Sequence, residues 1–160
     1  MTVVELFEIV IKDAFWSAIA SMGFGVLFNV PPRTLFGCAL AGAAGHSLRT
    51  ALAEGVHMPL EPATLLGAAV VGLLGMYFSQ RWQTPAQVFN VTGAIPLVPG
   101  LLAYGAMLGF VDVTVGNDPA GEAVLLQAMV DMIRTAFILG AIALGITTPS
   151  LLLRRQKPVV

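Results

Sequence analysis

Long uncharged stretches alternate with short charged ones along the chain. The uncharged runs, which are rich in Ala, Leu, Val and Gly, are residues 14–32, 34–48, 62–80, 82–111 and 135–153. A helix needs about 20 mostly apolar residues to cross the roughly 30 Å hydrocarbon core of a bilayer. The run 34–48 reaches this length only if its helix continues past Arg49 to about Ala53. The pattern predicts five membrane-spanning helices, at about residues 10–30, 34–53, 62–80, 89–111 and 133–153.

Charged residues are scarce in this chain. Hydrophobic residue types make up 57% of the sequence and Asp, Glu, Lys and Arg only 11%, whereas soluble domains contain about 25% charged residues. With a mean hydropathy of +0.86, the chain has too few charged side chains to cover a water-soluble core. We therefore expect an all-α integral membrane protein that forms a single transmembrane domain over residues 1–160.

The same composition argues against several classes of function. A net charge of −1 does not fit a basic surface for nucleic acid. Cys38 is the single cysteine, so it has no partner for an internal disulfide, and no metal-ligand spacing accompanies it. Phosphate-binding loops and nucleophile elbows are missing as well. We expect a protein that is not an enzyme and needs no metal or cofactor.

The charged residues outside the apolar runs are divided by sign. Basic side chains gather on one side of the expected bundle, at Arg33, Arg81, Arg154, Arg155 and Lys157. Acidic side chains gather on the other side, at Glu5, Glu8, Asp13, Glu54, Glu61, Asp112, Asp118 and Glu122. Because Lys and Arg are enriched in cytoplasmic loops, the N-terminus is expected outside and the C-terminus in the cytoplasm.

The fourth apolar run contains a helix-breaking sequence, Pro96-Leu97-Val98-Pro99-Gly100. Two prolines and a glycine predict a break in the fourth helix near the middle of the bilayer. Broken backbone at that depth must be buried in protein or line a watery cavity. The second half-helix, from Gly100, would direct its free amides at an anion such as a carboxylate, and Tyr104 would add a hydroxyl. An ordinary proline kink satisfied by neighbouring helices is the alternative.

His46 and Arg49 lie three residues apart, on one face of the second expected helix. Arg49 has a planar guanidinium that could bind a carboxylate in two-point contact. The alternative is that its side chain extends to the outer interface of the membrane. His46 is a candidate for proton coupling, or makes a structural hydrogen bond to a neighbouring helix. Asp13 is interpreted as an interfacial residue rather than a cation ligand. The candidate substrate-binding residues are His46, Arg49, Pro96, Pro99, Gly100 and Tyr104.

Small residues recur at every fourth position on several expected helices. Examples on the first two helices are Ser17, Ser21 and Gly25, and Gly37, Ala41 and Gly45. Inside a membrane, helices associate by close backbone packing through such residues. On the last helix, Asp131 and Arg134 are interpreted as an intrahelical pair outside the bilayer, although a position within the bilayer stays open.

Two strings of residues carry a family resemblance over nearly the whole chain. The first is Phe28-Asn29-Val30-Pro31 with Arg33, followed by Cys38-Ala39-Leu40, Gly42, Gly45-His46 and Arg49. The second runs from Ile95 to Gly100 and includes Ala103-Tyr104 and Ala106-Met107. Together they resemble the threonine/serine exporter (ThrE) family, and more closely the small, YjjB-like subunit of its two-component members.

The resemblance implies a secondary exporter of small carboxylates in the inner (cytoplasmic) membrane of a bacterial cell. Threonine and serine are substrates in part of the family, and succinate is the substrate of the two-component relatives. Those relatives need a larger membrane subunit as a partner. Family members that fuse both halves, with five spans in each, would place the halves in opposite orientations, as in many alternating-access carriers.

The leading hypothesis is the small membrane subunit of an exporter for succinate or for threonine and serine. It would work by alternating access with a larger partner subunit. Two alternatives stay open: a scaffold that stabilises the larger subunit without itself transporting, and a channel formed by a homo-oligomer of this chain. The expected partners are the larger subunit, a small carboxylate substrate and the lipid bilayer, with no nucleic acid.

Overall fold

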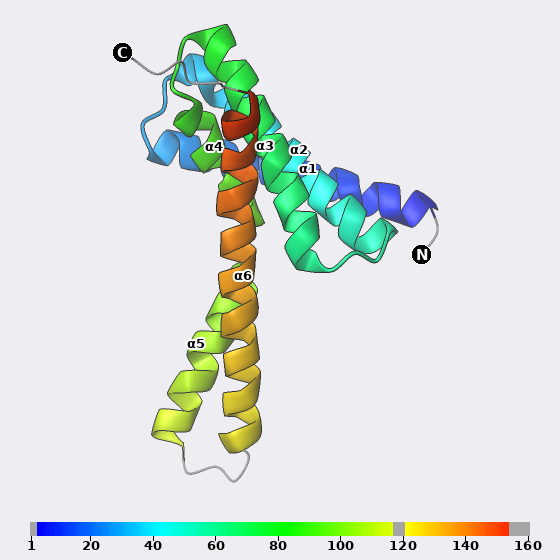
Figure 1. Ribbon diagram of the computed structural model, residues 1–160, viewed down its shortest axis with the longest axis vertical. Coiled ribbons are helices and arrows are strands. Elements are labelled where there is room, and N and C mark those ends of the chain that lie inside the picture. Colours follow the sequence, from blue (N-terminus) through cyan, green and yellow to red (C-terminus); the bar gives the residue numbers. More distant parts are fainter. Residues whose placement is uncertain (1–2, 117–120, 154–160) are drawn as a thin grey trace. The chain divides into compact units, whose positions relative to one another are not determined.

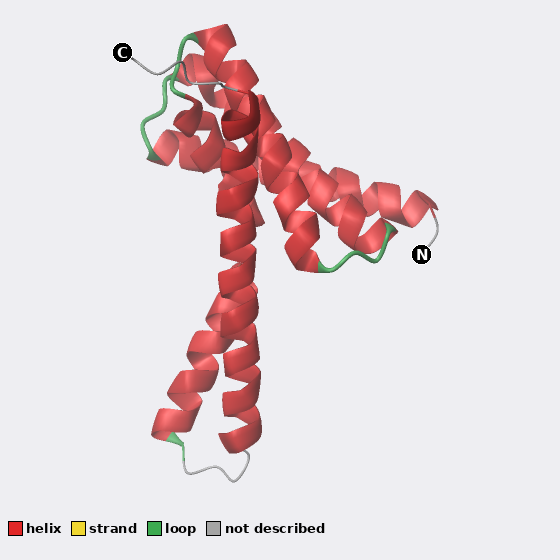
Figure 2. Ribbon diagram, in the orientation of Figure 1, coloured by secondary structure: helices red, strands yellow, loops and turns green. Residues whose placement is uncertain are grey.

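The computed structural model describes residues 3–116 and 121–153, and every regular element in these two ranges is helical (Figures 1 and 2). Arg154, Arg155, Lys157 and Asp118, which contribute to the predicted orientation, lie outside the described residues. The α-helices are α1 (Val3–Leu27), α2 (Leu35–Thr50), α3 (Leu60–Trp82), α4 (Ala86–Ala94), α5 (Gly100–Val115) and α6 (Gly121–Leu153). Short turns are a 3₁₀ turn at Pro32–Thr34, a π turn at Ala51–Gly55 and a 3₁₀ turn at Ile95–Leu97.

Two of these helices, α3 and α6, are each long and apolar enough to cross a membrane. Residues 86–97 and α5 also qualify when taken together as one broken span, which gives up to three candidate spans among the described residues. Helix α2 is only 16 residues long, about 24 Å at 1.5 Å per residue, although the π turn continues it to Gly55. The all-helical membrane architecture is therefore confirmed, while five spans and their orientation stay predictions.

The chain divides into two compact units, residues 1–97 with 141–160, and residues 98–140. In the first unit, α1 packs along α2, and α2 packs against α3 and α4 (Figure 1). Phe89 of α4 is fully buried, and its ring stacks on Trp82 of α3 with 5.7 Å between ring centroids. These two rings lie against Gly37 of α2, where a Cβ would lie 2.8 Å from the Phe89 ring.

Small residues form the contacts between the first three helices. Ser21 of α1 is fully buried, and a Cβ on Gly42 of α2 would overlap its side chain. Between α2 and α3, a Cβ on Gly67 would lie 2.6 Å from the carbonyl oxygen of Gly45. Residues with larger side chains at these places would force the backbones apart. The prediction that small residues allow close packing is confirmed for this unit.

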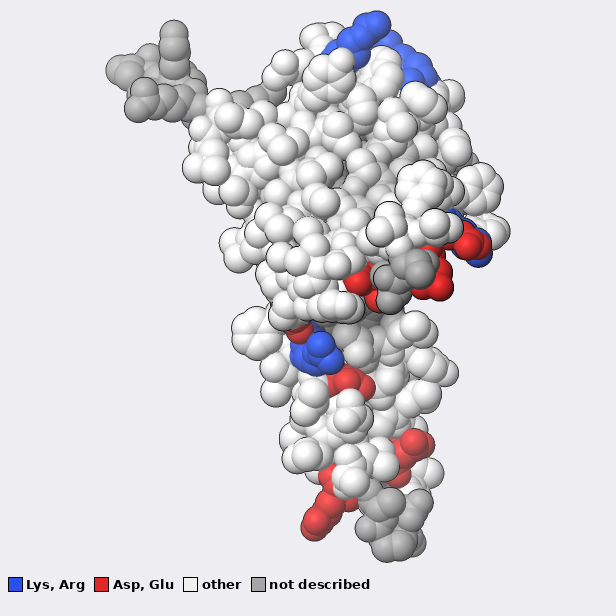
Figure 3. Space-filling model, turned by 90° about the vertical axis from the view of Figure 1, so that its right-hand side faces the viewer, with Lys and Arg blue, Asp and Glu red and all other residues white. Residues whose placement is uncertain are grey.

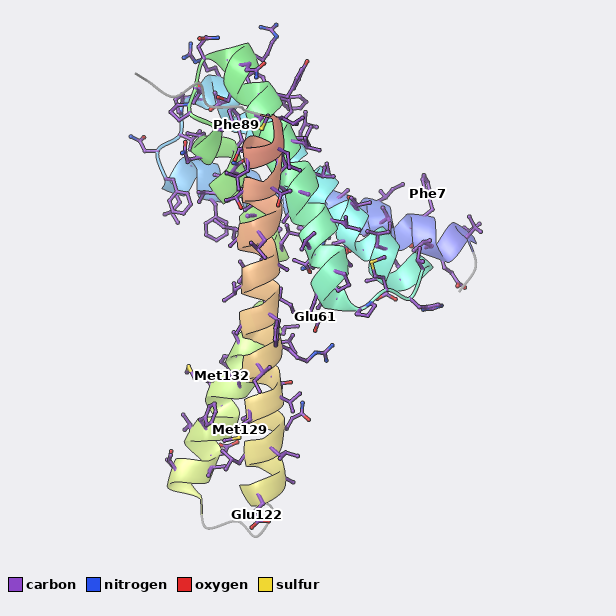
Figure 4. All side chains as sticks on the ribbon, in the orientation of Figure 1. Phe7, Glu61, Phe89, Glu122, Met129 and Met132 are labelled. Atoms are coloured by element: carbon purple, nitrogen blue, oxygen red, sulfur yellow. The ribbon has the colours of Figure 1, made fainter. Side chains whose placement is uncertain are left out.

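The second unit consists of α5 and the first part of α6, which lie side by side (Figure 4). Their contact passes through Gly109, where a Cβ would lie 2.7 Å from Ala128. Much of the remaining apolar surface is open: Leu101 is 89% exposed, and Met129 and Met132 are about half exposed. On the face that Figure 3 shows, most of the surface lacks charged side chains, as expected of surface that faces lipid or other protein.

Candidate functional site

The last turn of α2 brings three polar side chains onto one face. His46, Arg49 and Thr50 are spaced at i, i+3 and i+4, which places them side by side on a helix. Just before them, Gly45 lies close to Gly67 of α3, so the backbones of α2 and α3 approach closely here. The Cβ of Arg49 lies beside this contact. The π turn at Ala51–Gly55 then follows directly. Such turns are frequent at functional sites.

Asp13 of α1 completes this group of side chains. The Thr50 hydroxyl donates a hydrogen bond of 2.5 Å to Asp13 Oδ2. The same oxygen lies 3.4 Å from His46 Nδ1, and His46 Nε2 lies 2.6 Å from Arg49 Nη2. We call these four residues, Asp13, His46, Arg49 and Thr50, the polar cluster. It is half-buried, with the His46 side chain 15% exposed and that of Asp13 36% exposed.

The hydrogen bonds of the polar cluster assign the histidine tautomer. A guanidinium has only N–H donors, so the contact with Arg49 requires His46 Nε2 to be the acceptor. The imidazole is then neutral, with its proton on Nδ1, the nitrogen that faces Asp13 Oδ2 and Thr50 Oγ1. A second proton would occupy Nε2 and remove the acceptor that Arg49 uses. The cluster therefore has two chemically distinct arrangements that differ by one proton.

Arg49 also binds the broken helix. Its Nη1 donates a hydrogen bond of 2.9 Å to the carbonyl oxygen of Leu97. Leu97 is fully buried and ends the 3₁₀ turn Ile95–Leu97, after which the chain leaves helical geometry at Pro99, with φ −81° and ψ 67°. A carbonyl freed by such a break needs another donor, and Arg49 supplies it. The predicted break is confirmed at this position, and Pro96 lies within the turn that Arg49 contacts.

Three predicted site residues, Pro99, Gly100 and Tyr104, fall in the second unit. Pro99 precedes α5 without a capping side chain, and a Cβ on Gly100 would meet open space. The Gly100 amide bonds the carbonyl of Val98, while the next two amides have no acceptor within the helix. Tyr104 is 58% exposed. The binding of a substrate by these residues stays a prediction, as it does for His46, Arg49 and Pro96.

Asp13, Thr50 and the Leu97 carbonyl are the members of this site that the sequence interpretation did not include. The interfacial position of Asp13 stays a prediction, and in the structure its carboxylate accepts a hydrogen bond from Thr50 and faces His46. A signal was present, because Asp13 continues the four-residue spacing of Ser17, Ser21 and Gly25, the buried face of α1. A charged residue on that spacing faces the neighbouring helix.

The cluster combines groups that can exchange protons with a guanidinium that can bind an anion. Among the described residues, no group of three or more His, Cys, Asp or Glu side chains lies close enough to hold a metal ion. Arg49 uses one hydrogen on each of two nitrogens for Leu97 and His46. Since a guanidinium has five N–H donors, three remain for a carboxylate.

These observations define a class of protein. The chain is a helical membrane protein in which one candidate span is broken and a half-buried arginine binds the carbonyl at the break, an arrangement that resembles the discontinuous helices of transporters. The chain belongs to the family described as threonine/serine exporter, ThrE, whose model matches residues 13–152. This is a family of membrane transporters, so the resemblance seen in the sequence is confirmed.

One relative of this chain is a protein of Haemophilus influenzae that is described as uncharacterized. The two are 40% identical over 148 residues, which covers 92% of this chain and 49% of the relative. The chain therefore spans about half the length of the curated relative it matches. No solved structure matches the chain.

Proposed function

We propose that this chain is one half of a secondary exporter for small carboxylates, threonine and serine or succinate, and that it works with a larger membrane partner. Family membership supports export as the activity. The relative from Haemophilus influenzae, which is about twice as long, supports the need for a second half. The second unit exposes apolar side chains, such as Leu101 and Met132, that such a partner could cover. The proposed location is the inner membrane of a bacterial cell.

The observation that carries the mechanism is the double contact of Arg49, to the Leu97 carbonyl at the helix break and to His46 Nε2. Arg49 holds the broken segment in place while His46 is neutral. A proton on Nε2 removes one of the two acceptors and places a second positive charge beside the guanidinium. Arg49 is then free to turn to a carboxylate, so binding of a proton and of a substrate are coupled through one side chain.

The test is efflux from vesicles that contain this chain with and without its partner half, loaded with labelled threonine or succinate. We expect efflux of at least one substrate when both halves are present, and a stimulation when a proton gradient is imposed. Transport by the partner half alone at the full rate would contradict the proposal and favour a scaffold. Full transport by this chain alone would instead favour a homo-oligomeric channel or carrier.

The polar cluster is tested in the same vesicles. His46→Asn removes the titrating group but keeps a polar side chain of similar size, so efflux should lose its response to the imposed proton gradient. His57→Asn is the matched control, because His57 is exposed in the loop before α3 and is not a member of the polar cluster. An unchanged gradient response in His46→Asn would remove His46 from the coupling mechanism.

A further inference from the structure

A second polar region of the first unit is separate from the cluster around Arg49. A cavity of about 540 Å³ lies between the end of α3, the start of α4 and the end of α6. Its volume is within the range of small-molecule sites, about 300–1,000 Å³. The wall includes Ser79 of α3, Asn90 of α4 and Thr147 of α6. Arg81 follows two residues after Ser79, so by the predicted orientation this end of the bundle faces the cytoplasm.

The lining of this cavity is polar but uncharged. Ser79, Gln87, Asn90, Thr147 and Ser150 contribute hydroxyl and amide groups, and in the part of the chain that the structure describes no charged side chain lines it. The Thr147 and Ser150 hydroxyls donate to backbone carbonyls of their own helix, which leaves lone pairs on both oxygens as acceptors. These acceptors suit an ammonium or hydroxyl group of a ligand.

Hydrogen-bond donors come from α4. The helix begins at the cavity, where Pro85 precedes it without a capping side chain and Ala86 and Gln87 line the wall. The amide of Val88 donates to the Pro85 carbonyl, while the amides of Ala86 and Gln87 lack acceptors within the helix and favour a negative group. The donors thus come from α4 and the acceptors from α6, both of which line the cavity.

Asn90 contributes a buried polar atom to this region. Its Oδ1 is buried without a hydrogen-bond partner, which is costly unless something offsets it. The oxygen lies against Gly75 of α3, where a Cβ would overlap it. The glycine thus leaves room for the Asn90 amide at the wall of the cavity.

We propose that this cavity is a second binding site, on the cytoplasmic side, for a small zwitterion that carries a side-chain hydroxyl. The carboxylate would lie at the start of α4, and the ammonium and hydroxyl would bind the oxygens of Thr147 and Ser150. A dicarboxylate would bring a second negative charge to a wall whose described side chains are all uncharged, so the test below includes succinate. The inference rests on the proposed function, since it makes this cavity the place where an exporter first binds its substrate.

The test measures occupancy rather than transport. Ser79→Cys and Thr147→Cys place a thiol in the wall, and Thr148→Cys places one on the neighbouring residue of α6, which does not line the cavity. The native Cys38 is buried, so it contributes little background. Each variant is expressed with its partner half in membranes and labelled with a small thiol reagent in the presence of threonine, valine or succinate, and the mass shift of this chain is recorded.

We expect threonine to slow labelling at positions 79 and 147 but not at 148. Valine has nearly the same shape as threonine but lacks the hydroxyl, so its half-protecting concentration should be at least about fivefold higher. Equal protection by threonine and valine, or stronger protection by succinate, would overturn the ligand class. No protection by any of the three, or the same protection at all three positions, would overturn the site.

Failure of this inference can be told apart from failure of the proposed function. Efflux that persists in the vesicle assay without protection at positions 79 and 147 refutes the site alone. Protection without any efflux supports the site and refutes export. Thr147→Val and Thr148→Val provide the transport counterpart, because only the first should raise the threonine concentration needed for half-maximal efflux.

Discussion

Removal of the Arg49 guanidinium tests the central contact of the polar cluster. In Arg49→Ala, the carbonyl of the fully buried Leu97 and the Nε2 of His46 both lose the donor that they have in the wild-type protein. An orphaned buried polar group costs about 1–3 kcal/mol. The two acceptors together give about 2–6 kcal/mol as an upper range, because neighbouring effects are not additive.

Thermal unfolding in detergent and efflux from vesicles measure the two consequences separately. Arg49→Ala should lower the unfolding midpoint and reduce efflux more than about tenfold, the factor that corresponds to 1.4 kcal/mol. Arg49→Lys keeps the charge but loses the fork that bridges two acceptors. It should therefore recover part of the stability and little of the efflux. Arg33→Ala is the control, because Arg33 is exposed in the 3₁₀ turn before α2.

The reasoning is refuted if Arg49→Ala inserts normally and exports at the wild-type rate. It is also refuted if Arg33→Ala lowers efflux by the same factor, since the effect would then follow from net charge rather than from the contact with Leu97. Recovery of both stability and efflux in Arg49→Lys would show that a positive charge suffices. In that case the bridging geometry would have no role in transport.

Further predictions concern the neighbouring contacts. Asp13→Asn keeps an acceptor for Thr50 but removes the negative charge beside His46, so efflux should respond less to a proton gradient while the unfolding midpoint changes little. Gly42→Val should lower the midpoint by overpacking the α1–α2 contact, at a cost of about 1–3 kcal/mol, whereas Gly23→Ala, where a Cβ meets open space, should not. Because the hydrogen bond and charge of Lys12 lower the pKa of Glu8, Lys12→Met should raise that pKa in an NMR titration.

Two features of this fold could be predicted because each depends only on residues that are close together in the sequence. The break after Leu97 follows from two prolines that remove backbone donors, and the shared face of His46 and Arg49 follows from their spacing. The ends of the helices were harder to predict. The span expected at about residues 10–30 covers only part of α1, which the structure describes over Val3–Leu27 with the exposed pair of Glu8 and Lys12 in its first half.

The partners in the polar cluster could not be predicted in the same way. The contact between Asp13 and Thr50 joins residues 37 positions apart in sequence, and that between Arg49 and Leu97 joins residues 48 apart. A periodic pattern assigns a face to each residue but does not align two helices along their length. That alignment depends on small residues such as Gly42 and Gly67, which set how closely the backbones approach.

The two contacts of Arg49 also bear on the order of events in the proposed exporter. A carboxylate that takes both engaged N–H groups must break the bond to the Leu97 carbonyl, which is costly because that carbonyl is buried. A carboxylate that takes only the three remaining N–H groups leaves the broken segment held. Protonation of His46 releases one engaged group first and lowers the cost of full binding. Coupling of this kind is reciprocal, so a bound carboxylate would in turn favour the proton on His46.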